Sequence, residues 1–221
     1  MLWQPQTGFV LGRAAIDASG GIVGGTLDPT HTGSNLVLSN GNLTVTNSTS
    51  NLGVAMSVTG HSSGKWYFEY TCVTGQTGST GYYQSIGICQ SGFPYNTGLA
   101  GGSIGLSVGL RDDTSGQGSV YLNGTVTSVN NIGLSVGVGQ TGACAIDLTN
   151  TLIWFKGPGW SNLWYFSGGN APDGAGGINF STVTPSPFYV AAGNAFGAKY
   201  TVNLIGTSPA YTPPAGYNWW G

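Results

Sequence analysis

Short runs of alternating apolar and polar residues, separated by Gly, Asn, Ser and Pro, cover most of this 221-residue chain. Helical spacing of the apolar residues is almost absent, so the pattern predicts an all-β sandwich or barrel. Asn-Gly pairs at 40–41 and 123–124 predict tight hairpin turns. The segments that we expect to form strands are 35–39, 43–46, 53–59, 65–72, 84–89, 103–110, 119–124, 133–139, 143–148, 151–156, 188–193 and 199–205.

Two of these segments predict how the strands are buried. In 65–72, KWYFEYTC, alternation places Trp66, Phe68 and Tyr70 on one face, which we expect to be the core face. Segment 151–156, TLIWFK, is apolar on both faces. This pattern is typical of a strand that is covered on two sides.

Residues 1–33 have weaker apolar content and no clear alternation. We interpret them as an N-terminal arm or linker ahead of one compact domain, residues 34–221. The alternative is an extra edge strand followed by a loop. A terminal arm without its own core needs another surface to hold it in place.

The composition fits a folded protein with an almost uncharged surface. Hydrophobic residues make up 40% of the chain and charged residues only 5%, against roughly 25% charged in an average globular protein. The basic residues are few and scattered, so we expect no nucleic-acid partner. No apolar run is long enough for a membrane helix, and the N-terminus lacks the basic and apolar regions of a secretory signal.

Cysteine and histidine give no metal or cofactor site. Cys72, Cys89 and Cys144 are odd in number and lie in apolar runs, which predicts buried free thiols. His31 and His61 are isolated in turn-like contexts, so zinc binding is not expected. We expect no metal and no cofactor.

The acidic residues do not predict catalysis either. A glycosidase needs two carboxylates across a groove, roughly 5–9 Å apart, and no strand carries acidic residues in alternation. Glu69 and Asp147 lie in predicted strands, on the faces opposite the clearest core residues. His61 is followed by Ser62 and Ser63, but adjacency in sequence is not the geometry of a catalytic triad. We therefore expect a protein that is not an enzyme.

From about residue 27 to 220 the chain resembles a SPRY domain, in the form found in bacteriophage proteins. The segments that carry the resemblance, in family order, are LDPTHTGSNLVLSNGNLTVT (27–46), SSGKWYFEYTC (62–72), SIGIC (85–89), SVYLNGTV (119–126), VGVGQTGACAIDLTNTLIWFKGPGW (136–160) and VNLIGTSPAYTPPAGYNWW (202–220). The resemblance implies a bent antiparallel β-sandwich, a concanavalin-like jelly roll, that binds partners through loops at one end.

Two departures from the family pattern mark one region as unusual. Gln140-Thr141 stands where the family has Asp, and Gly157-Pro158-Gly159 replaces Asn-Gly. An insertion, 160–181, follows. Its aromatic residues lie beside many Gly, Asn and Ser residues, a mixture that suits sugar stacking and protein recognition alike. The alternative is that these rings fold back over the end of the core.

We take the loops as the candidate ligand-binding surface. The candidate residues are Trp160, Trp164 and Tyr165 in the insertion, Phe93 and Tyr95 in a second aromatic loop, Tyr82 and Tyr83 in a third, and the polar turn residues Arg111, Asp112 and Asp113. For the last group, a turn whose side chains accept backbone hydrogen bonds is the alternative to a cation- or sugar-binding loop.

The resemblance and the loop composition together predict a bacteriophage virion protein of the tail-fibre or head-spike type. We expect it on the particle surface, docked on other virion proteins through the N-terminal arm and bound to a host-surface receptor, a glycan or a protein. A symmetric homo-oligomer is compatible with this role. The alternatives are a purely structural virion component, such as a decoration, adaptor or cement protein, and a host-targeted adaptor that binds a peptide.

Overall fold

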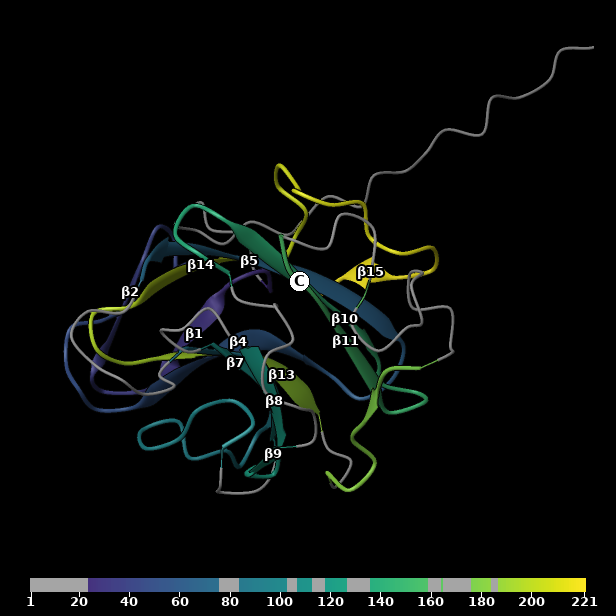
Figure 1. The fold of residues 1–221 in the computed structure, drawn as a ribbon, viewed down its shortest axis with the longest axis horizontal. Coiled ribbons are helices and arrows are strands. Elements are labelled where there is room, and N and C mark those ends of the chain that lie inside the picture. The colour runs from purple at the N-terminus through teal and green to yellow at the C-terminus, as the bar shows by residue number, and fades with distance from the viewer. Residues whose placement is uncertain are drawn as a thin grey trace, which may run out of the picture.

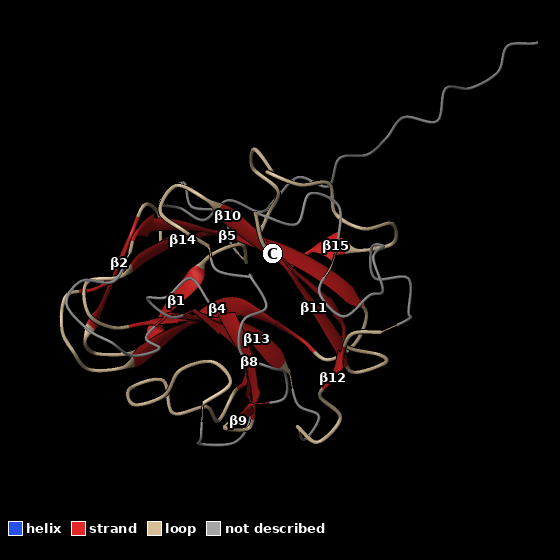
Figure 2. Cartoon of the chain, in the orientation of Figure 1, coloured by secondary structure: helices blue, strands red, loops and turns tan. Residues whose placement is uncertain are grey.

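The computed structural model describes residues 24–75, 84–102, 107–112, 118–126, 136–158, 164, 176–183 and 187–221. Over these residues the chain forms strands and turns, without a helix, and accordingly contains no helix that could cross a membrane. Figures 1 and 2 show two sheets that face each other across a shared interior. The expected all-β sandwich is confirmed.

The first sheet is antiparallel throughout its described strands. Its order is β1 (Leu27–Thr32), β4 (Gly53–His61), β13 (Phe188–Asn194), β6 (Gln84–Gln90), β7 (Ser107–Asp112), β8 (Gly118–Leu122) and β9 (Thr125–Val126). The register between β4 and β13 shifts between Tyr189 and Ala191. Ser57 fills this irregularity, because its hydroxyl donates to the Thr59 carbonyl and accepts from the Val190 N–H.

The second sheet has the order β12 (Ile178–Asn179), β11 (Leu152–Lys156), β10 (Thr141–Asp147), β5 (Lys65–Thr74), β14 (Lys199–Asn203), β3 (Thr44–Asn47) and β2 (Leu36–Ser39). A further short strand, β15 (Asn218–Trp219), pairs with β5 in parallel. This pairing departs from the otherwise antiparallel arrangement. It brings the end of the chain beside the first residues of β5 (Figure 1).

The interior between the sheets is apolar. Phe68, Ile88, Phe155 and Trp220 are completely buried there. Of the three residues predicted to face the core from β5, Phe68 and Tyr70 are buried, and Trp66 is partly buried against the same cluster. The core face predicted by alternation is therefore confirmed.

The outer face of the second sheet is also covered. Tyr67, Ala145 and Trp154 form an apolar cluster there with Trp164 and Tyr217. This confirms the prediction that segment 151–156 is covered on two sides. The other face of β5 was not expected to be buried, and the C-terminal segment covers it.

Strand positions agree with the sequence pattern in most segments, with some differences. In segment 133–139, the described residues 136–139 form a turn rather than a strand. Short strands β9, β12 and β15 were not separately expected. Asn40 and Gly41 have φ values of +53° and +62°, and Asn123 and Gly124 have +49° and +83°, as the predicted Asn-Gly turns require.

The sandwich begins earlier than the boundary expected at residue 34. β1 is the edge strand of the first sheet, paired with β4. The Leu27 side chain is completely buried. Residues 27–32 therefore form an extra edge strand, as the alternative interpretation expected. The strand packs through the apolar side chain of Leu27 rather than through regular alternation of apolar and polar residues. Residues 1–23, the rest of the predicted arm, lie outside the described residues.

Candidate functional site

The structure buries two of the aromatic residues that the sequence marks as candidate ligand contacts. Phe93 is 2% exposed and packs on the outer face of the first sheet, against Val54 and Met56. Trp164 is 4% exposed and lies edge-on to Tyr67, with ring centroids 6.1 Å apart. These two rings pack against the sheets, as the fold-back alternative describes, and their faces are not open to a ligand in this arrangement.

Trp164 also contacts a buried lysine. The Lys156 ammonium lies 5.8 Å from the centre of the Trp164 ring and 4.7 Å from that of Tyr211. Burial lowers the pKa of Lys156. The two rings face the cation with their negative π-faces, which offsets part of its lost hydration. This contact gives Trp164 a structural role.

Several candidates fall where the structure gives no side-chain description. Trp160, Tyr165, Tyr82, Tyr83 and Asp113 lie outside the described residues. Arg111 and Asp112 belong to β7, where their backbones pair with Ser85 and Gln84 of β6. Their proposed ligand contacts stay predictions.

Tyr95 is the candidate whose neighbours, His31 and Asn96, line two recesses. Its ring is partly exposed and meets the His31 ring edge-on, with centroids 5.9 Å apart. Its carbonyl accepts the Val54 N–H at 2.9 Å, which fixes the 91–97 loop to β4. The residue after it, Asn96, lines an open hollow at one end of the sandwich.

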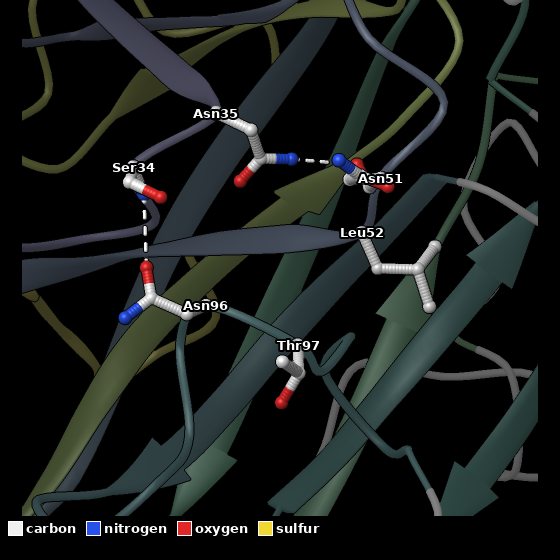
Figure 3. A pocket seen from close by; sticks show the side chains of 6 residues that line it. All are labelled: Ser34, Asn35, Asn51, Leu52, Asn96 and Thr97. Carbon is white, nitrogen blue, oxygen red and sulfur yellow. Dashed lines mark hydrogen bonds between the residues drawn. The ribbon is translucent and has the colours of Figure 1, made fainter.

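Three chain connections form this amide-rich hollow. Its lining residues are Ser34 and Asn35 between β1 and β2, Asn51 and Leu52 between β3 and β4, and Asn96 and Thr97 between β6 and β7 (Figure 3). The volume is about 370 Å³. None of the six side chains carries a charge.

Hydrogen bonds between the connections hold the hollow together. Other polar groups of its lining remain exposed and can contact a ligand. The Ser34 N–H donates to Asn96 Oδ1 at 2.9 Å, and Asn35 Nδ2 donates to the Asn51 carbonyl at 2.6 Å (Figure 3). The Asn96 and Thr97 side chains are exposed. Their amide N–H₂ and hydroxyl groups can therefore donate to a ligand.

Glycine permits the close approach of the connections. A Cβ on Gly33 would lie 2.8 Å from the Tyr95 carbonyl oxygen, and one on Gly53 would lie 2.6 Å from Asn35 Oδ1. Any larger residue at either position would push the 91–97 loop or the Asn35 side chain out of place. The sequence pattern did not single out Asn35, Asn51 or Asn96, since Asn is common in all the turns of this chain.

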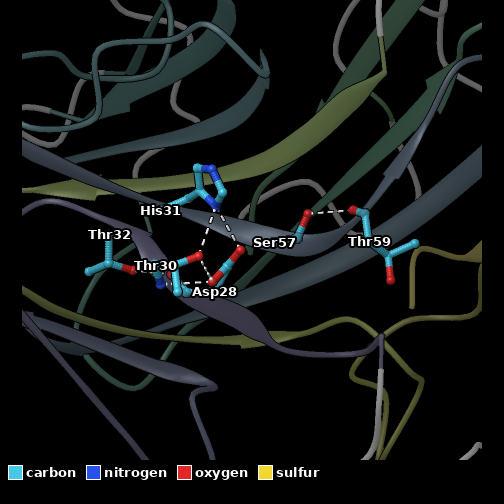
Figure 4. A network of polar contacts seen from close by, with 6 residues as sticks. All are labelled: Asp28, Thr30, His31, Thr32, Ser57 and Thr59. Carbon is cyan, nitrogen blue, oxygen red and sulfur yellow. Dashed lines mark hydrogen bonds and ion pairs between the residues drawn. The ribbon is translucent and has the colours of Figure 1, made fainter.

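A second, smaller recess lies beside Tyr95 on the outer face of the first sheet. It has a volume of about 110 Å³ and is lined by Asp28, His31, Met56, Ser57, Val58, Ser91 and Tyr189. His31 Nδ1 lies 2.8 Å from Asp28 Oδ2, and the Thr30 hydroxyl donates to Asp28 Oδ1 at 2.7 Å (Figure 4). Burial alone would raise the pKa of Asp28, but the hydrogen bonds from His31 and Thr30 outweigh it and lower this pKa.

Two potentially reactive side chains of the described residues, Ser57 and Glu69, are engaged in internal hydrogen bonds. Ser57 lines the smaller recess, but its hydroxyl is engaged within the sheet, and Figure 4 shows it directed toward Thr59. Glu69 is held by the C-terminal segment. Within the described part of the chain, no group of three or more His, Cys, Asp or Glu residues is placed to hold a metal. All three cysteines are buried and outside any disulfide, as predicted.

Comparison with solved structures identifies this two-sheet fold as that of a SPRY domain. The chain is similar to the crystal structure of the SPRY domain of human HERC1, with a TM-score of 0.57 and 16% identity, over 82% of this chain and 99% of that one. It is also similar to the PSpry domain of TRIM65, with a TM-score of 0.56 and 13% identity, over 81% of this chain and 91% of that one. At these identities the likeness concerns the fold.

Comparison of sequences adds no further relative: no protein-family model matches the chain, and no curated protein matches it. The SPRY fold expected from the sequence motifs is thus supported by structure. The bacteriophage form of the family belongs to the proposal below.

Proposed function

We propose that this protein is a non-enzymatic binding module that recognises a neutral glycan in the amide-rich hollow. We further propose that it does so on the surface of a bacteriophage particle, where the glycan belongs to the host cell. The phage setting is supported by the sequence resemblance and by a surface rich in Gly, Ser, Thr and Asn. The binding role is supported by the geometry of the hollow.

The observation that carries the proposal is the chemistry of the hollow's lining. Its exposed groups are amides and hydroxyls, which match the hydroxyls of a sugar as donors and acceptors, and Leu52 offers an apolar contact. The hollow's volume of about 370 Å³ leaves room for a ligand of the size of a sugar ring rather than only for a small ion. The absence of charge from these six residues disfavours phosphate and other anions as the ligand.

Glycan binding can be measured on an array of bacterial surface polysaccharides, followed by titration calorimetry of the best ligand. Asn96→Asp retains the acceptor oxygen for the Ser34 N–H and removes the free amide donor. Thr97→Val removes the hydroxyl while keeping the side-chain shape. Each change should weaken binding about fivefold, since one hydrogen bond contributes about 1 kcal/mol.

The matched control is Asn179→Asp in β12. Asn179 is also exposed, and its Oδ1 also accepts a backbone N–H, from Ser181. It lies in the second sheet, apart from the hollow. Asn179→Asp should bind like the wild type. Equal weakening by all three variants, or no glycan bound by the folded wild type, would overturn the proposal.

A structural role in the particle is the second candidate, and exposed valines favour it. Val73 and Val138 are 39% and 65% exposed. They lie in segments joined by the hydrogen bond from the Gly139 N–H to the Cys72 carbonyl. Exposed apolar side chains that lie together can mark a contact with another protein.

Val73→Thr/Val138→Thr separates the two roles. If the valines contact a neighbouring subunit, purified particles should contain less of this variant than of wild-type protein by mass spectrometry. If the protein only binds the receptor, the variant should be incorporated normally. In that case Asn96→Asp should be incorporated as well, and the particles should adsorb poorly to the host.

A further inference from the structure

The smaller recess beside Tyr95 combines an apolar floor with a polar rim. Met56 and Val58 of β4 both line the recess together with Tyr189 of β13. Met56 is 1% exposed, whereas Val58 is 43% exposed. The buried Met56 side chain therefore forms the bottom of the recess, and the more exposed Val58 side chain forms one apolar side.

The Tyr189 ring is fixed as a wall of this recess. A Cβ added to Gly60 would lie 2.7 Å from the ring. The ring thus lies directly over the Gly60 backbone, and Gly60 pairs with Tyr189 across the sheet. A fixed aromatic wall beside an apolar floor suits a methyl group or another small apolar group.

The polar rim is held in one arrangement. Because His31 Nδ1 faces the Asp28 carboxylate at 2.8 Å, the neutral ring carries its proton on Nδ1, which leaves Nε2 as an acceptor. Ser91 lines the same recess and is exposed. These groups match an acetamide. The His31 acceptor can bind the amide N–H, the Ser91 hydroxyl can donate to the amide carbonyl, and the apolar residues can contact the methyl group.

We infer that the smaller recess binds the acetamido group of an N-acetylated amino sugar in the glycan. This inference rests on the proposed function, since it names the class of sugar in the glycan that the hollow recognises. The volume of about 110 Å³ is less than a third of the 370 Å³ of the hollow, which suits a small group such as acetamido rather than a whole sugar ring. The two recesses adjoin along the chain: His31 precedes Ser34 by three residues, and Ser91 and Asn96 share one loop.

Methionine supplies a direct reporter of the recess. The chain contains two methionines, Met1 and Met56. A protein labelled with ¹³C at the methionine methyl therefore gives two NMR signals, and the signal that disappears in Met56→Leu belongs to Met56. The probes are three matched pairs: N-acetylglucosamine with glucose, N-acetylgalactosamine with galactose, and N-acetylmannosamine with mannose. At least one N-acetyl sugar should shift the Met56 signal saturably, and its parent hexose should not.

Variants locate the effect. Val58→Thr replaces one methyl at the open side of the recess with a hydroxyl, and should weaken binding of that N-acetyl sugar about fivefold. Val37→Thr is the matched control: Val37 is an exposed strand valine in β2, 63% exposed, outside both recesses. It should leave the affinity unchanged.

The outcomes separate this inference from the proposed function. If sugars move backbone amide signals of Asn96 and Thr97 but never the Met56 methyl, the hollow binds glycan and the acetamido assignment is wrong. If parent hexoses shift Met56 as strongly as their N-acetyl partners, the assignment is also wrong. If no sugar moves any signal and the glycan array is empty, the proposed function fails, and the inference fails with it.

Discussion

The carboxylate of Glu69, in the middle of β5, accepts the backbone N–H of Tyr211, 142 residues later in the chain, at 2.9 Å. The same carboxylate accepts the Ala210 N–H at 2.9 Å and the Tyr67 hydroxyl at 2.8 Å. Glu69 is only 2% exposed. The single glutamate of the chain thus fastens the C-terminal segment across the outer face of the second sheet.

Glu69→Gln should destabilise the protein by about 1–3 kcal/mol, because the new amide N–H₂ would face hydrogen-bond donors where an acceptor is required. Urea unfolding followed by tryptophan fluorescence measures this loss. Tyr67→Phe removes one of the three donors and should lose less. A Glu69→Gln protein as stable as the wild type would show that the carboxylate does not fasten the segment.

Acid should destabilise the fold through His61. The His61 ring stacks on Trp66 with centroids 3.5 Å apart, and Nε2 lies 2.7 Å from the Trp220 carbonyl oxygen. Burial lowers the pKa of His61, and the hydrogen bond to Trp220 raises it by less. Because the folded pKa lies below the ordinary value of about 6.5, stability from this residue is complete above that pH and is lost as the pH falls toward the folded pKa.

The measurement is the unfolding free energy at about pH 7.5 and about pH 5.5, a window in which histidine titrates. His61→Gln should remove part of the difference between the two values. Asp28 does not interfere, since its lowered pKa lies well below this window. A wild-type protein that is equally stable at both values would contradict the prediction.

Trp164→Ala should lower stability by about 3–5 kcal/mol, as expected when a large buried ring is removed. The ring packs on Tyr67 and Lys156. Thermal unfolding is the direct measurement, and adsorption to host cells should be compared only between variants that remain folded. Unchanged stability would indicate that the ring does not pack as described and would return Trp164 to the ligand-binding candidates.

Gly109→Ala should disturb the loop that carries Tyr95 and Asn96. A Cβ on Gly109 would lie 2.7 Å from Ala100 Cβ, so the 98–102 segment would have to move away from the sheet. We expect a loss of about 1–3 kcal/mol in stability together with weaker glycan binding. Gly75→Ala is the control, since its Cβ would meet only Val138 at an ordinary 3.4 Å; equal effects of both changes would count against a specific role for this packing.

The strand pattern predicted the fold because each face of a strand reports its own surroundings. Phe68 and Tyr70 alternate as a core face should, and segment 151–156 is apolar on both faces because both are covered. The same logic failed for Glu69, whose charge suggests solvent. Its partners are backbone N–H groups far along the chain, which no local pattern can show.

The candidate site was harder to predict than the fold. Aromatic residues in Gly-rich loops have the same composition whether they are exposed or buried, and Phe93 and Trp164 are buried. The amides of the hollow belong to three connections that are distant in sequence. Close packing at Gly33 and Gly53 and hydrogen bonds between the connections bring them together, so the site emerges from tertiary structure.

The burial of Trp220 also has a consequence for biosynthesis. Its ring packs edge-on against Phe68 and His61, and its Nε1 donates to the Thr59 carbonyl. The ribosome makes β4 and β5, one strand of each sheet, early but adds Trp220 only about 150 residues later, roughly 7–30 s at usual rates of synthesis. Throughout that interval the nascent chain exposes unpaired strand edges and an unfilled apolar interior. The yield of folded protein should therefore depend strongly on chaperones that shield such surfaces. This dependence should be weaker for a domain whose core is filled by segments close together in the sequence.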